Sequence, residues 1–161
     1  YEMTSSLVGS EMCIRDRGMP VLHDYAKVIA KGAPKGAYIL SPCPKEEDLK
    51  AVIIATGSEV HLALEAQKKL TKRHIGVQVV SMPSWDLFDS QSAAYRRRVL
   101  PKDVPAIAVE AGVRTGWARY TGSEDHVIGI DTFGASGPGK TVYKEYGFTV
   151  DHIVDMVRKV K

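Results

Sequence analysis

The run most suggestive of chemistry is the glycine-rich segment 134–141, GASGPGKT. It matches the phosphate-loop pattern GxxxxGK[ST], in which backbone N–H groups hold phosphates, a lysine reaches the terminal phosphate and a threonine holds Mg²⁺. However, Pro138 removes one backbone donor, and Gly147 cuts short the helix that should follow. We therefore expect a plain strand-to-helix turn, with a small nucleotide-binding module as the alternative. The motif positions concerned are Gly134, Gly139, Lys140 and Thr141.

A second candidate lies where predicted strands end. The Thr56-Gly57-Ser58 turn leads from an apolar run into a helix N-terminus, where backbone donors and the helix dipole favour an anion. Glu110 follows another apolar run and should lie at the same edge, where open α/β sheets bind ligands. The pattern predicts an anion- or ligand-binding rim at these four residues. Simple capping of the helix by the Ser58 hydroxyl is the alternative.

Other reactive residue types are scattered. The Arg96-Arg97-Arg98 run could contact phosphate or an acidic partner, but a solvated helix face explains it more simply. The five histidines form no close ligand set, and Ser136 does not fit a nucleophile elbow. The residues by themselves therefore predict no catalytic, cofactor-binding or metal-binding group.

Composition is that of an ordinary folded domain. The chain has 161 residues, 44% of them hydrophobic, and a net charge of +3, enough for one core and too little charge to indicate a nucleic-acid partner. No apolar run approaches the ~20 residues of a membrane span. Cys13 and Cys43 form neither a CxxC pair nor a metal set, which favours a reducing, cytoplasmic location.

The elements that must position these residues alternate along the chain. Helical periodicity follows Ser58 up to a predicted stop at Gly76, and a last helix starts at Thr149, its predicted cap, with Asp151 in the first turn. Parallel strands need crossover helices, so we predict a three-layer α/β/α sandwich. Five short apolar runs read as strands, at 37–40, 51–56, 77–82, 106–109 and 126–130.

Five blocks of the sequence occur in the order and spacing of one known family: ATGSEVHLALEAQKKL, VVSMPSWDLFDSQSAAYRRRVLP, AIAVEAG, DTFGASGP and YGFTVDHIV. On these blocks, the sequence from Gly18 onward resembles the C-terminal domain of transketolase. Related thiamine enzymes, deoxyxylulose-phosphate synthase and the pyruvate dehydrogenase β subunit, differ at 81–84, 88–89 and 95–101, where this chain agrees with transketolase. The resemblance implies a mixed, mostly parallel five-stranded sheet whose first strand opposes the others.

The resemblance also implies a function for the whole enzyme. Transketolases are homodimers that move two-carbon ketol units between sugar phosphates, with thiamine diphosphate and a divalent metal (Mg) held by two upstream domains. This sequence carries neither the GDG…N cofactor signature nor the glutamate that activates the cofactor, so the chain is expected to be a structural and association domain without catalysis of its own. The family has an Arg-Gln pair, its arginine holding substrate phosphate, where Asp16-Arg17 stands here, and Arg17 is given no role.

The resemblance divides the chain into three parts. Residues 1–17 show no sustained period and are expected to be a non-native or disordered leader. Residues 18–36 are expected to link to a missing upstream domain, and residues 37–161 to form the transketolase-like domain.

Overall fold

The structure is a computed structural model that describes residues 21–135 and 137–160. The expected leader at 1–17, with Cys13 and Arg17, lies outside these residues, as does Ser136. In the 18–36 segment, helix α2 (Ala26–Gly32) lies between two short 3₁₀ turns, η1 (His23–Tyr25) and η2 (Ala33–Lys35). No helix among the described residues is long and apolar enough to cross a membrane.

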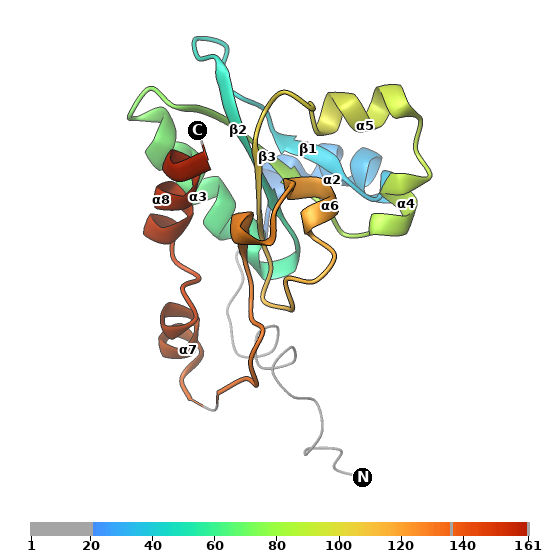
Figure 1. The fold of residues 1–161 in the computed structure, drawn as a ribbon. Helices are drawn as coiled ribbons and strands as arrows, with labels where there is room; N and C mark the ends of the chain where they lie inside the picture. The colour runs from blue at the N-terminus through green and yellow to red at the C-terminus, as the bar shows by residue number, and fades with distance from the viewer. Residues whose placement is uncertain (1–20, 136, 161) are drawn as a thin grey trace.

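Five strands form one sheet in the order β1-β3-β2-β4-β5. Figure 1 labels β1, β2 and β3 of this sheet. Strand β1 (Tyr38–Ser41) runs antiparallel to β3 (Gly76–Ser81). The others run parallel to their neighbours: β2 (Leu49–Ala55), β4 (Ala106–Val109) and β5 (Val127–Ile128). The sheet is therefore mixed and mostly parallel, with its first strand reversed, as predicted.

Helices cover both faces because the central strands are apolar on both sides. Along β2, Ile53 joins one core cluster while Val52 and Ile54 join the other, since successive strand side chains point to opposite faces. Helices α3 (Val60–Thr71) and α8 (Val150–Val160) contribute to the first cluster. The second cluster lies under α4 (Trp85–Asp89), α5 (Ala93–Val99) and α6 (Ala118–Thr121). This is the predicted three-layer sandwich.

The local sequence signal predicted the start of α8 correctly and the end of α3 wrongly. The N–H of His152 donates to Thr149 Oγ1 at 3.2 Å, so Thr149 caps α8 as predicted. The prediction that Gly76 stops α3 is wrong. The helix ends at Thr71, His74 takes the left-handed conformation with φ 56°, and Gly76 is the first residue of β3. A Cβ on Gly76 would lie 2.2 Å from the carbonyl oxygen of Asp48, so the glycine serves close packing.

Candidate functional site

The predicted rim lies at the point where the strand order of the sheet reverses. Ala55 of β2 pairs with Val109 of β4. The chain leaves β2 toward β3 on one side and later enters β4 on the other. The structure thus brings Thr56 and Glu110 to adjacent strand ends, at the type of edge where doubly wound sheets bind ligands.

Ser58 is not the helix cap predicted from the sequence. A 3₁₀ turn, η3 (Gly57–Glu59), precedes α3, and the helix shows no side-chain cap. The Ser58 hydroxyl instead donates to the Glu59 carboxylate and lies 3.0 Å from the hydroxyl of Tyr143. Gly57, with φ 53° and open space around it, turns the chain toward this arrangement.

The centre of the rim is Glu59, which the sequence prediction missed. Only 4% of this residue is exposed. Its Oε1 accepts hydrogen bonds from the Ser58 and Tyr143 hydroxyls, and its Oε2 accepts the N–H of Ala111 at 3.3 Å. A glutamate in the first turn of a helix ordinarily complements the helix dipole at the surface. The Glu59 carboxylate is instead buried against the hydroxyl of Tyr143, a residue of α7 (Gly139–Glu145) 84 positions away. No signal in the neighbouring sequence indicated this burial.

Glu110 places a second carboxylate beside Glu59. The indole N–H of Trp117 donates to Glu110 Oε2 at 2.7 Å. Burial raises the pKa of Glu110, the Trp117 hydrogen bond lowers it, and the Glu59 charge raises it again, with a net rise. Two carboxylates at one edge oppose the binding of an anion there. An anionic ligand at Thr56, Gly57, Ser58 and Glu110 therefore remains a prediction that the local charge does not favour.

The loops next to the rim hold two exposed apolar side chains. The Asp131 carboxylate accepts the backbone N–H of Arg114 at 3.0 Å and forms an ion pair with its guanidinium, which joins the loop after β4 to the loop after β5. Phe133 beside this pair is 95% exposed, and Val113 is 63% exposed. The Tyr146 hydroxyl donates to the carbonyl oxygen of Phe133 at 2.8 Å, so the exposed ring is carried on a tethered backbone.

The phosphate-loop match has no phosphate-loop geometry in the described residues. The N–H groups of Thr141 and Val142 donate to the carbonyl of Pro138 within the first turn of α7, at 2.8 and 3.1 Å. This helix has 7 residues, whereas a phosphate loop opens a long helix with free N–H groups. Lys140 and Thr141 are exposed. A nucleotide site at Gly134, Gly139, Lys140 and Thr141 is therefore not favoured.

No group of three or more His, Cys, Asp or Glu side chains that could hold a metal occurs within 21–135 and 137–160.

Comparison with known proteins identifies the family. The sequence profile described as "Transketolase-like TK C-terminal domain" matches residues 36–149. The chain is 48% identical over 143 residues to transketolase from Bacillus subtilis (strain 168), covering 88% of this chain and 21% of that protein. It is 46% identical to transketolase 1 from Escherichia coli (strain K12), covering 78% of this chain and 19% of that protein. The solved structure of transketolase from Leishmania mexicana superposes with a TM-score of 0.74 at 43% identity, covering 81% of this chain and 18% of that one.

The mixed, mostly parallel sheet with helices on both faces defines a three-layer α/β domain. The chain belongs to the transketolase family and corresponds to its C-terminal domain. It spans about a fifth of the length of the curated relatives it matches.

Proposed function

We propose that this chain is the structural and association domain of a transketolase that transfers two-carbon ketol units between sugar phosphates as a full-length homodimer. Family membership carries this proposal, since 48% identity extends over 143 residues of the Bacillus subtilis protein. The domain contributes packing and contacts with upstream domains and a second subunit. Localisation in the cytoplasm belongs to the same proposal.

Thiamine diphosphate and its metal are assigned to the upstream domains. The described part of the glycine-rich segment does not fit a diphosphate, because the N–H groups of Thr141 and Val142 donate to the carbonyl oxygen of Pro138. At the rim, the carboxylates of Glu59 and Glu110 oppose a diphosphate by charge. Thiamine diphosphate chemistry is therefore no part of the role proposed for this domain.

The association role has its best candidate surface at Phe133 and Val113. A phenylalanine that is 95% exposed leaves a large apolar ring in water. The ion pair between Arg114 and Asp131 and the hydrogen bond from Tyr146 restrict the loop that carries it. A restricted backbone loses little entropy when the ring is buried in a contact. These features support Phe133 as a contact with the upstream domains.

The first test uses the 161-residue chain alone. We expect no ketol transfer and no heat of thiamine diphosphate binding by calorimetry in the presence of Mg²⁺. Either signal would overturn the proposal that catalysis lies upstream.

A second test supplies the upstream domains as a separate polypeptide, cut from the Bacillus subtilis transketolase before the matched region. We expect sedimentation velocity to show a complex that Phe133→Ser weakens. The matched control is Leu87→Ser, which alters a side chain that is 47% exposed on α4. The absence of a complex with the unaltered chain would overturn the association role, and equal weakening by both variants would remove Phe133 from the contact.

A further inference from the structure

A groove with a volume of about 760 Å³ lies between α5, the loop that follows it, and α6. Its floor includes Val52 and Ala106, neighbouring residues of β2 and β4. Ala106 is the first residue of β4, whereas Glu110 follows its last residue. The groove is therefore separate from the rim of carboxylates at the other end of the strand.

Four cationic side chains from three segments line this groove. Arg96 and Arg97 come from α5, Lys102 from the following loop and Arg119 from α6. Asp89 is the only carboxylate among the lining residues. Arg96, Arg97 and Lys102 form no ion pair with any residue that the structure describes. The groove thus combines three uncompensated positive charges with one compensated pair.

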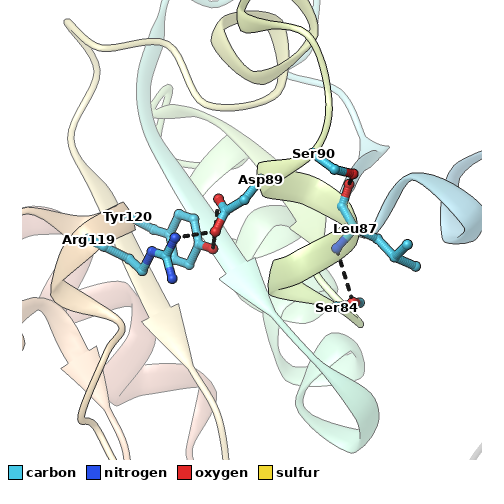
Figure 2. A network of polar contacts seen from close by, with 6 residues as sticks. All are labelled: Ser84, Leu87, Asp89, Ser90, Arg119 and Tyr120. Atoms are coloured by element: carbon cyan, nitrogen blue, oxygen red, sulfur yellow. Dashed lines mark hydrogen bonds and ion pairs between the residues drawn. The ribbon is translucent and has the colours of Figure 1, made fainter.

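Asp89 and Arg119, the compensated pair, both line the groove, and Figure 2 shows the contacts between them. Asp89, on α4, forms an ion pair with Arg119 and accepts the hydroxyl hydrogen of Tyr120 at 3.1 Å. Burial and the Asp89 charge raise the pKa of Tyr120 to about 12. Because Asp89 is engaged by two partners on α6, it is poorly placed to neutralise the cations on α5. The structure therefore keeps the positive charge of Arg96, Arg97 and Lys102 available.

All three arginines of the run are exposed, as expected of a solvated helix face, but their surroundings differ. Arg98 lies over the ring of Tyr95, at 5.0 Å from its centroid, and is absent from the groove lining. Arg96 and Arg97 line the groove instead, together with the partly buried Leu100 and Val104. The tertiary structure thus sorts the run into one ring-stacked arginine and two groove arginines.

We propose that this groove binds a phosphorylated small molecule, with its phosphoryl group against Arg96, Arg97 and Lys102. Guanidinium groups match phosphoryl oxygens with paired hydrogen bonds, and clustered cations favour the doubly charged phosphoryl group over a single carboxylate. The apolar part of the molecule lies against Leu100 and Val104. The volume falls within the range of about 300–1,000 Å³ for small-molecule sites. The site is independent of the catalytic assignment above.

Calorimetric titration of the 161-residue chain with phenyl phosphate and with inorganic phosphate tests this proposal. We expect saturable binding of both at low ionic strength, tighter for phenyl phosphate because its ring contacts the apolar wall. The double variant Arg96→Glu/Arg97→Glu should weaken phenyl phosphate binding at least about tenfold, since charge-assisted hydrogen bonds are lost. Lys102→Ala, a milder change, should weaken it in the same direction.

The matched control is Lys72→Glu/Arg73→Glu, which changes the net charge equally at exposed residues after α3. It should leave binding within about twofold, and circular dichroism should show that every variant is folded. Equal weakening by both double variants would show only a general charge effect and overturn the site. Absence of saturable binding would also overturn it, as would tighter binding of a hexaglutamate peptide than of phenyl phosphate.

Discussion

The hydroxyl of Tyr143 on α7 donates a hydrogen bond to the buried carboxylate of Glu59, immediately before α3. This bond connects the C-terminal part of the chain to the turn that follows the carboxyl end of β2. It also helps to satisfy a carboxylate that would otherwise be costly to bury.

Tyr143→Phe should destabilise the domain by about 1–3 kcal/mol, because a buried carboxylate loses a hydrogen-bond donor. Urea unfolding followed by circular dichroism measures the change. Tyr146→Phe is the control, since its hydroxyl bonds to the carbonyl of Phe133 at an exposed position, and it should cost less than about 1 kcal/mol. Equal costs for the two variants would contradict the role given to the Glu59 contact.

Glu110→Gln should change how stability depends on pH. Because burial raises the folded-state pKa of Glu110 above its usual 4.5, its favourable contribution is fully present below that value and is lost as pH rises through the folded-state pKa. Glutamine does not titrate and keeps an acceptor for Trp117. The variant should therefore gain stability relative to the unaltered chain as pH rises above 4.5.

Urea unfolding at several pH values measures this gain, with Glu65→Gln as the control at an exposed position of α3. A pH-independent difference between the Glu110→Gln variant and the unaltered chain would refute the prediction. Asp131 and Asp151 affect the pH dependence of stability only at more acidic pH. Their pKa values are lowered from 3.8 by contacts with Arg114 and Lys69, so their contributions are present above that value and are lost only at more acidic pH.

Asp89→Asn should lower the pKa of Tyr120 from about 12 toward its usual value of 10. The substitution removes the Asp89 charge and leaves burial, the larger cause, in place, so the shift should be partial. Titration of tyrosinate absorbance, compared with the Asp89→Asn/Tyr120→Phe double variant, isolates this residue. A Tyr120 pKa unchanged by Asp89→Asn would show that the contacts in Figure 2 do not couple the two groups.

Gly36→Ala should cost about 3 kcal/mol or more, whereas Gly122→Ala should cost about 1–2 kcal/mol. Both glycines have nearly the same positive φ, 81° and 80°. A Cβ at Gly36 would lie 2.3 Å from the backbone nitrogen of Phe88, while a Cβ at Gly122 would meet nothing within 4 Å. Chemical denaturation of both variants separates the conformational cost from the steric one, and similar costs would contradict the close approach of α4 to Gly36.

The sequence alone determined the layered fold and the start of the last helix. Residues 51–55 are apolar at every position, which suits only a strand buried on both faces, and Thr149 caps α8 through atoms three positions away. The resemblance to transketolase supplied the direction of β1, which local periodicity does not encode. Pro138 and Gly147 already argued against a phosphate loop, because both act on the backbone of their own segment.

Only the tertiary structure decided which side chains meet at the rim and at the groove. Ser58 has the residue type of a helix cap, yet its hydroxyl bonds to Glu59 and lies against Tyr143. Arg96 and Arg97 are part of a uniform basic run until α6 and Lys102 complete a groove around them. Periodicity and capping involve residues within a few positions of one another, so a sequence shows them directly. Burial of a charge and the shape of a groove depend on partners far along the chain, which come together only when the sheet and its helices pack.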